Sequence, residues 1–378
     1  MPRRTHGDTA PVTPEHPDFT SRQLITYLGN KRALLAPIGA ALERVQRRLG
    51  RDRLRVLDAF AGSGVVSRYL KASAAYLACN DLEEYAAVVG RCFLANRSGV
   101  DEPALRVLVA ELNARVASER MPPGFLQELY APRDDANIAA AERVFYTAEN
   151  ARRLDDYRRL IDLAPPAFRD LLLGPLLGLA SVHANTAGVF KGFYKDRATG
   201  LGRFGGSGAD ALVRIRGRIE LAVPVLSRFE CEVDVFQDDA NAVARRVRGL
   251  DLAYLDPPYN QHPYGSNYFM LNLLARYERP AAVSAVSGIP TDWCRSGYNV
   301  RAKSLGLIED LIGALDAPFV MLSYNDEGFV PPAEMLAALS KCGRVEVIAT
   351  TYNAFRGSRN FTARPVHVTE QLFLIERQ

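Results

Sequence analysis

Short apolar runs that end in polar residues alternate along the chain with segments of helical periodicity. Such runs are typical of buried parallel strands, whereas an amphipathic helix repeats its apolar residues every three or four positions. The helical pattern is clearest after Gly29, with apolar residues at 34, 35, 38, 42, 45 and 49. The sequence predicts strands over 55–60, 75–80, 250–255, 318–324, 344–350 and 371–376, and one more that ends near Phe236. This alternation predicts an α/β fold.

The alternation stops after Arg97 and resumes about 130 residues later, near Cys231. A crossover between neighbouring parallel strands needs only about a dozen residues, so this segment is too long for a connection. We therefore expect a domain inserted into the sheet domain. The expected division is a disordered lead-in over 1–22, a sheet domain over 23–100 and 230–378, and an inserted domain over 101–229.

The strand predicted over 250–255 ends at Asp256-Pro257-Pro258-Tyr259. Two consecutive prolines cannot donate to a sheet ladder, so the chain should leave the sheet at Asp256. A residue before proline is held extended, which leaves the Asp256 carboxylate and the Pro257 carbonyl free to accept hydrogen bonds. Two acceptors beside the Tyr259 ring suit the exocyclic amine of adenine. The alternative is a turn that ends the strand and whose aspartate caps the next segment.

A second candidate site follows the first predicted strand, where Phe60, Gly62 and Gly64 form an FxGxG turn. Glycines permit a tight turn whose backbone N–H groups approach a ligand. Ser67 stands where a dinucleotide fingerprint has its third glycine. Asp81 ends the next predicted strand, where an acidic side chain suits two ribose hydroxyls, and capping of the following helix is its alternative role. A nucleotide-type fold is therefore predicted.

DPPY and FxGxG together resemble the amino-methyltransferases that use S-adenosylmethionine. The strings DPPYNQHPYGSNY, SYNDEGF and YNAFRGSRN resemble the Dam-like DNA adenine methylases, particularly modification methylases of type II and type IIS restriction systems. The resemblance extends from about Leu24 to the end of the chain. It implies a Rossmann-like, seven-stranded methyltransferase sheet with one antiparallel strand and an inserted, mainly helical and loop DNA-recognition domain. It also implies S-adenosylmethionine as the cofactor, and catalysis by Asp256, Pro257, Pro258 and Tyr259.

The resemblance also suggests cofactor ligands. Tyr27 and Lys31 match an N-terminal segment that lies under the methionine part of the cofactor, where a ring attracts the sulfonium and a lysine takes the carboxylate. Near the end of a later strand, Asp239 or Asp238 would accept from the cofactor adenine while Phe236 lines that pocket. The expected cofactor set is Tyr27, Lys31, Asp58, Phe60, Gly62, Gly64, Asp81, Phe236, Asp239 and Asp256.

The second half of the inserted segment is basic, with seven basic and two acidic residues from Lys191 to Arg218. Glycines and the rings of Phe190, Phe193, Tyr194 and Phe204 are interleaved with them. This pattern suits loops that enter a groove, with cations for phosphates and rings for bases, and a solvated mobile loop is the alternative. Another basic stretch holds Arg364. We expect DNA contacts from Lys191, Lys195, Arg197, Arg203, Arg356 and Arg359.

Composition narrows the class of protein further. The 378 residues are 48% hydrophobic and 24% charged, and the net charge of +4 permits nucleic-acid binding. Five scattered cysteines without a CxxC pair predict neither a disulfide framework nor a zinc site, so we expect no metal. No apolar run approaches the ~18 residues of a membrane span. The start of the chain lacks the apolar core of a signal peptide, so we expect a cytoplasmic protein.

These features together predict a site-specific DNA adenine methyltransferase that flips one adenine out of duplex DNA and methylates its 6-amino group. We expect a monomer on DNA that serves as the modification enzyme of a restriction system, with any cognate endonuclease acting separately. One alternative is an RNA adenine or protein-glutamine methyltransferase, although those typically carry Asn where this chain has Asp256. Another is a catalytically silent DNA-binding module, against which the intact set of Tyr27, Lys31, Asp81 and Asp256 speaks.

Overall fold

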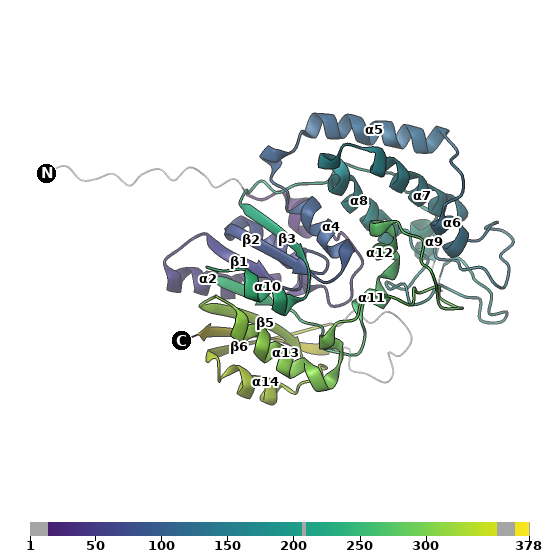
Figure 1. Cartoon of the computed structure of the whole chain (residues 1–378). Coiled ribbons are helices and arrows are strands. Elements are labelled where there is room, and N and C mark those ends of the chain that lie inside the picture. Colours follow the sequence, from purple (N-terminus) through teal and green to yellow (C-terminus); the bar gives the residue numbers. More distant parts are fainter. Residues whose placement is uncertain (1–13, 206–208, 354–366, 378) are drawn as a thin grey trace.

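The computed structural model describes residues 14–205, 209–353 and 367–377, and these residues build one seven-stranded sheet (Figure 1). The strands are β1 (Leu54–Asp58), β2 (Ala74–Asp81), β3 (Glu232–Gln237), β4 (Leu252–Leu255), β5 (Phe319–Asn325), β6 (Gly343–Asn353) and β7 (His367–Arg377). Their order is β3-β2-β1-β4-β5-β7-β6, and β7 runs antiparallel to both β5 and β6 while the first five strands are parallel. The predicted α/β fold, with its seven-stranded, Rossmann-like sheet and one antiparallel strand, is confirmed.

Helices cover both faces of this sheet (Figure 1). On one face lie α2 (Leu35–Leu49), α3 (Val65–Leu70) and α4 (Glu84–Phe93), and on the other lie α10 (Ala240–Arg246), α13 (Arg301–Ala314) and α14 (Pro332–Leu339). Every residue of β4 and β5 is buried. A strand covered on both faces has no solvent side, which is why these two appear in the sequence as continuous apolar runs.

A further group of helices packs on α4, away from the sheet (Figure 1). It contains α5 (Glu102–Ser118), α6 (Phe125–Tyr130), α7 (Ala148–Leu163), α8 (Arg169–Val182) and α12 (Phe269–Arg276). These helices share one apolar core with α4, and the buried Arg158 of α7 donates to the Leu274 carbonyl of α12. The segment expected to be an inserted domain is therefore joined to the sheet domain through a common core, and its boundaries at 101 and 229 stay a prediction.

Short helices complete the described chain. They are α1 (Pro17–Ser21), α9 (Ala209–Arg216), α11 (Tyr264–Asn267), η1 (Lys31–Leu34), η2 (Lys71–Ser73), η3 (Arg97–Gly99), η4 (Pro166–Phe168) and η5 (Gly297–Asn299). The expectation of a disordered lead-in over 1–22 is wrong for residues 14–22, because this segment contains helix α1. Phe19 is only 1% exposed, and the buried Arg68 guanidinium donates to the carbonyls of Phe19 and Arg22. A buried guanidinium needs acceptors, and this segment supplies them.

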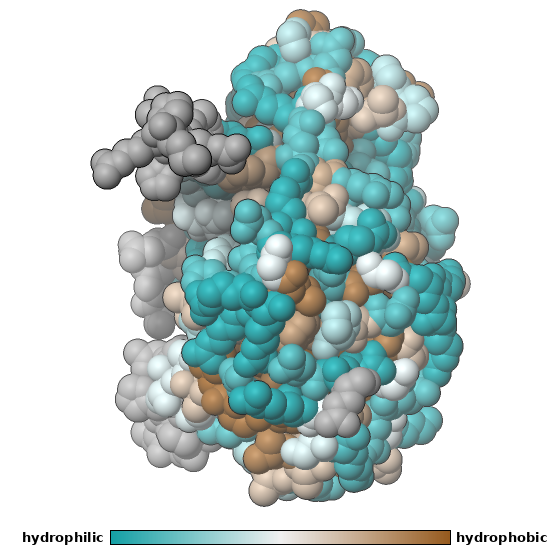
Figure 2. Space-filling view, turned by 90° about the vertical axis from the view of Figure 1, so that its left-hand side faces the viewer, coloured by the Kyte–Doolittle hydropathy of each residue, from teal (hydrophilic) through white to brown (hydrophobic). Residues whose placement is uncertain are grey.

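Seen from the side on which the C-terminus lies in Figure 1, the surface is largely hydrophilic, with hydrophobic side chains in patches between (Figure 2). Ion pairs contribute to the hydrophilic surface of α2, where Arg44 and Arg48 both contact Glu346. Among the described residues, no helix has the length and apolar character needed to cross a bilayer.

Candidate active site

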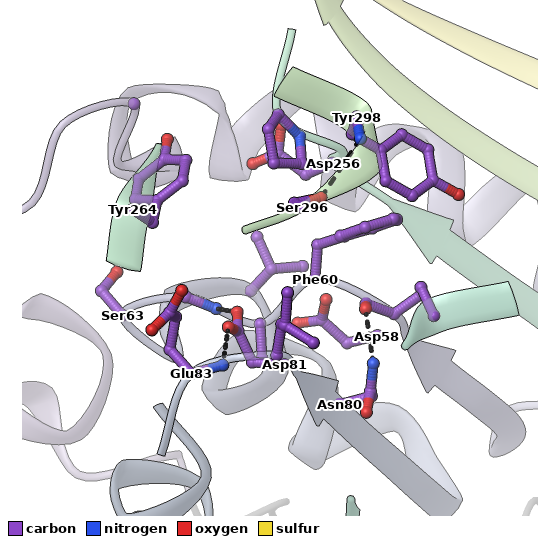
Figure 3. Close-up of a pocket in the computed structure, with 18 of the residues that line it drawn as sticks. Asp58, Phe60, Ser63, Asn80, Asp81, Glu83, Asp256, Tyr264, Ser296 and Tyr298 are labelled. Carbon is purple, nitrogen blue, oxygen red and sulfur yellow. Dashed lines mark hydrogen bonds between the residues drawn. The ribbon is translucent and has the colours of Figure 1, made fainter. Parts of the chain in front are cut away.

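The carboxyl ends of β1, β2 and β4 meet at one edge of the sheet. Asp58 ends β1, Asp81 ends β2, and Asp256 directly follows β4. Because β1 pairs with both β2 and β4, the three carboxylates line one cavity, which encloses about 860 Å³ including space open to solvent (Figure 3). Pro258 also lines it, and Pro257 is buried. The structure thus brings the glycine turn and the Asp256 loop together.

Backbone hydrogen bonds hold the glycine turn after β1. Ala61 N donates to Asn80 O at 2.8 Å, and Gly64 N donates to Ala61 O at 2.8 Å. The φ angles of Gly62 and Gly64 are 53° and 73°, which residues with a side chain rarely adopt. A Cβ atom added to Gly62 would lie 2.9 Å from ring atoms of Tyr27. The turn therefore passes directly against the Tyr27 ring. Among the predicted ligands, Gly64 does not line the cavity itself.

Asp81 holds the glycine turn in place. Its carboxylate accepts from Gly62 N at 2.8 Å and from Glu83 N at 2.9 Å. Burial raises the pKa of Asp81, and these hydrogen bonds act in the opposite direction. Glu83 lines the same cavity and was missed in the sequence. Its side chain accepts from Asn272 Nδ2 at 2.6 Å, and burial raises its pKa to about 7. Two carboxylates therefore face this side of the cavity.

Asp58 is fully buried in the lining of the cavity. Ser67, the residue at the position of the missing third glycine, donates from Oγ to Asp58 Oδ2 at 2.5 Å. Within the described part of the chain, Asp58 Oδ1 has no hydrogen-bond partner. Burial raises the pKa of Asp58 to about 7, while the Ser67 hydrogen bond lowers it. A buried carboxylate oxygen without a donor is costly, so this atom suits a donor or cation of a bound ligand.

Asp256 belongs to a buried group of charges that joins three elements. The Lys31 ammonium lies 3.0 Å from Asp256 Oδ1 and 2.7 Å from Glu370 Oε1 of β7. Ser323 Oγ and Asn325 Nδ2 also donate to Glu370, at 2.6 and 3.2 Å. Burial raises the pKa of Asp256 to about 7 although Lys31 lowers it. Burial alone would lower the pKa of Lys31, but the two carboxylates hold it well above its ordinary value.

Tyrosine rings lie beside the Asp256 loop. The rings of Tyr27 and Tyr264 stack with centroids 5.1 Å apart, and both line the cavity. Tyr259 is half-buried, with its ring edge-on to Tyr324 at 6.0 Å and its centroid 5.7 Å from the Lys31 ammonium. Tyr259 is not among the lining residues, so its expected contact with a base remains a prediction.

The end of β3 supplies only part of the expected adenine pocket. Asp238 and Asp239 line the cavity, but Asp239 accepts from two backbone N–H groups as the N-cap of α10, and Asp238 pairs with Arg246 at 2.7 Å. Phe236 does not line the cavity, because its ring lies under the Arg246 guanidinium at 5.7 Å. Tyr298 stands at this end of the cavity together with Phe60, at a centroid distance of 5.1 Å (Figure 3).

A segment beyond the Asp256 loop completes the lining and was also missed. Tyr298 OH donates to Asn241 Oδ1 at 2.5 Å, which ties the segment to α10. Asn299 Nδ2 donates to the Asn260 carbonyl at 2.7 Å, which ties it to the loop after Tyr259. The lining residues here are Cys294, Ser296, Tyr298 and Asn299. The run CRSGYN has no spacing that marks a ligand, so only the tertiary structure reveals it.

The basic loop of the inserted segment lies outside the cavity lining. Two of its aromatic rings are buried in the protein core and are not exposed to contact bases, because Phe190 and Phe204 are 2% and 8% exposed. Phe190 N donates to the Asn267 carbonyl of α11 at 2.7 Å, so the loop is tied to the helix that follows the Asp256 loop. Arg214 is occupied by backbone carbonyls, including that of Ala184 at 2.8 Å.

Four of the six residues predicted to contact DNA lie in the described part of the chain. Lys191, Lys195, Arg197 and Arg203 are exposed on the loop, where Lys195 lies over the Phe193 ring at 5.3 Å and Arg203 lies 3.6 Å from Asp196. Arg356, Arg359 and Arg364 lie outside the described residues. The four cations of the loop are therefore accessible to a ligand.

The strand order, the glycine turn and the acidic cavity at the carboxyl ends define a methyltransferase of the Rossmann-like class. Comparison with protein families identifies the family within this class. The model of the D12 class N6 adenine-specific DNA methyltransferases matches residues 27–197 and 217–288, which is more than half of the chain. The protein belongs to this family of adenine-specific DNA methyltransferases.

Named relatives agree with this family. The type II methyltransferase M.NlaIII of Neisseria lactamica is 28% identical over 92% of this chain and 100% of its own length. The type II methyltransferase M.CviAII of Paramecium bursaria Chlorella virus 1 is 24% identical over 93% of this chain and 98% of its own length. The modification methylase StsI of Streptococcus sanguinis is 26% identical over 93% of this chain, which spans 52% of that protein.

Proposed function

We propose that this protein transfers a methyl group from S-adenosylmethionine to the 6-amino group of an adenine flipped out of duplex DNA, at a specific sequence. The observation that supports this most is the position of Asp256. Its carboxylate faces the cavity that also holds the glycine turn and the unpartnered oxygen of Asp58. A hydrogen-bond acceptor for the amine therefore adjoins a pocket suited to a cationic donor.

The cavity residues fit S-adenosylmethionine by charge and shape. Asp58 Oδ1 lacks a donor, and Glu83 adds a second carboxylate for cationic or hydroxyl groups of the cofactor. Tyr27 and the Gly62 backbone lie against each other at the wall expected for the sulfonium. Tyr298 offers an aromatic wall for an adenine, beside Asp238 and Asp239. When bound, S-adenosylmethionine supplies the electrophilic methyl group of its sulfonium, whose sulfur keeps the electron pair of the broken bond.

In this proposal the protein acts by holding the adenine amine. Asp256 and the Pro257 carbonyl accept its two hydrogens, so that the nitrogen lone pair is free to form the new carbon–nitrogen bond. The methylated nitrogen then loses one proton, which Asp256 can accept and pass to water. A carboxylate with a pKa of about 7 is suited to this transfer, because it is largely ionised at slightly alkaline pH and still basic enough to take a proton.

Lys31 receives a different role from the one expected. Its ammonium contacts Asp256 and Glu370 at 3.0 and 2.7 Å, so we assign it to the charge balance of the catalytic loop instead of the cofactor carboxylate. Tyr259 is proposed to stack on the flipped base, which offsets part of the few kcal/mol that flipping costs. Lys195 and Arg197 are proposed to contact phosphates.

The relatives named type II methyltransferases and modification methylases support a further proposal, that the protein is the modification enzyme of a restriction system. We propose that it binds duplex DNA as a monomer and that any endonuclease acts separately.

The decisive experiment is to map methylated adenines by sequencing DNA from cells that express the protein. We expect one short sequence to be modified. Purified protein should then transfer labelled methyl groups to duplex DNA carrying that sequence and not to RNA or total protein. Incorporation into RNA or protein instead of DNA would contradict the proposal.

Asp256→Ala tests the proposed catalytic loop. Methyl transfer should be lost while calorimetry still detects S-adenosylmethionine binding, because Asp256 acts on the amine. Asp52→Ala, an exposed residue just before the amino end of β1, is the matched control and should keep full activity. Wild-type turnover of Asp256→Ala would refute the role of the carboxylate.

A further inference from the structure

Glu370 is a buried carboxylate that the proposed reaction has not used. It lies on β7, opposite Asn325 of β5. Because β7 is antiparallel, its first half lies at the edge where the parallel strands end, and this is the edge that carries Asp256. The topology therefore brings a residue close to the C-terminus beside the catalytic loop. The Glu370 side chain is 1% exposed.

One ammonium is shared by two carboxylates at this point. Lys31 is 4% exposed and lies between Asp256 and Glu370. The two acceptors differ, because Glu370 also receives hydrogen bonds from Ser323 and Asn325, whereas the Asp256 side chain is 19% exposed and faces the cavity. Glu370 is thus the fixed partner of Lys31, and Asp256 is the partner that an incoming amine can reach.

We propose that Glu370 is a positioning residue for methyl transfer: by holding Lys31, it fixes the ammonium beside Asp256 and leaves the Asp256 carboxylate only partly neutralised. This inference rests on the proposed function of Asp256. A carboxylate that shares its cation accepts hydrogen bonds from the amine, and later its proton, more readily than one that holds the cation alone.

Other charged groups face Asp256 and stay unchanged when Glu370 is altered. The Asp81 and Asp58 carboxylates interact with it from β2 and β1, and tyrosines face it from β4, the loop after β4 and α11. The groups that face Asp256 are Lys31, Glu370, Asp81, Asp58, Tyr254, Tyr259 and Tyr264. Among these, Glu370 acts to raise the pKa of Asp256, whereas Lys31 lowers it. Loss of the Glu370 charge should therefore lower the pKa of Asp256.

Glu370→Gln keeps the shape of the side chain and removes its charge. We expect kcat on the mapped duplex to fall about 100-fold, the loss typical of a displaced catalytic group. The acidic limb of the pH profile of kcat should move to lower pH, and KM for DNA should stay within about twofold because no DNA contact is removed. A duplex with 2-aminopurine at the target position should show the same fluorescence rise on binding, since base flipping does not require Glu370.

Two further variants separate positioning from folding. Glu376→Gln makes the same change on the same strand, at a residue paired with Arg48 away from the cavity, and should match the wild type. Ser323→Ala removes one hydrogen bond to Glu370 and should cause a smaller change in the same direction, which gives a result even if Glu370→Gln fails to fold. A folded Glu370→Gln with wild-type kcat and pH profile would overturn the inference, as would an unchanged Ser323→Ala. Absence of methylation by the wild type would overturn the proposed function instead.

Discussion

Lys31→Met is the substitution whose consequences follow most directly from the buried charges. Methionine keeps the stem of the lysine and removes the ammonium, so the Asp256 and Glu370 carboxylates lose the cation between them. Breaking a buried ion pair by removing one partner costs about 3–5 kcal/mol. Domains of 150–250 residues lose roughly 2–4 °C of Tm per kcal/mol, and a longer chain loses less. We therefore expect Tm to fall by about 5 °C at pH 8.

The pH dependence of this loss has a definite sign. Burial already raises the pKa of Asp256 to about 7 with Lys31 present, and loss of Lys31 removes an influence that lowers it. The same loss raises the pKa of Glu370, which Lys31 holds below its ordinary value against the effect of burial. An acid whose pKa is higher in the folded state than in the unfolded state destabilises the folded state at pH values above the folded-state pKa. At pH values below the unfolded-state pKa it has no such effect. The fall in Tm should thus be larger at pH 8 than at pH 6.

Thermal unfolding of the wild type and the variant at pH 6 and pH 8 measures both effects. Lys341→Met is the matched control, because its ammonium is 73% exposed and lies 3.3 Å from Glu309. Exposed ion pairs contribute little, so Tm of this control should change by less than about 1 °C. An equal fall at both pH values for Lys31→Met, or no fall at all, would refute the assignment of Lys31 as a buried neutralising charge.

Three further predictions concern ligands. Gly62→Ala should weaken S-adenosylmethionine binding about tenfold in calorimetry, because the added Cβ meets a tyrosine ring at 2.9 Å at a φ of 53°, while Gly99→Ala, with open space around it, should not. Affinity for S-adenosylmethionine should rise from pH 6 to pH 8 as Asp58 and Glu83, each with a pKa of about 7, ionise, and Asp58→Asn should reduce that rise. Arg197→Ala should reduce the salt slope of duplex binding by about one in fluorescence anisotropy, and Arg47→Ala, exposed on α2, should leave it unchanged.

The central strands β4 and β5 could be predicted because they are buried on both faces and end in polar residues. The carboxylates of Asp58, Asp81 and Asp256 could be predicted to meet for the same reason, since the carboxyl ends of paired parallel strands share an edge. Phe236 shows the limit of this reasoning. Side chains alternate between the two faces of a strand, so a ring near a strand end can point to either one, and this ring packs under Arg246.

Tyr298 and Glu370 could not be predicted, because tertiary structure alone brings Tyr298 to the cavity and Glu370 to Lys31 beside Asp256. Glu370 depends on the antiparallel direction of β7, which no local pattern marks. Tyr298 depends on hydrogen bonds from its segment to α10 and to the loop after Tyr259. Residues that reach a site through long-range contacts leave no spacing in the sequence, whereas residues at strand ends do.

The negative charge of the cavity favours one order of binding, with the cofactor before DNA. Among the described residues, six with carboxylates line the cavity, Asp58, Asp81, Glu83, Asp238, Asp239 and Asp256, and Lys31 is the basic residue of the described lining. Such a pocket attracts a cation and repels the phosphates of DNA. A sulfonium cofactor bound first would offset this negative charge, so that an adenine on a polyanionic strand enters a more nearly neutral site. In the proposed reaction, methyl transfer would remove the sulfonium charge, and the carboxylates would then hold the product less strongly than the substrate.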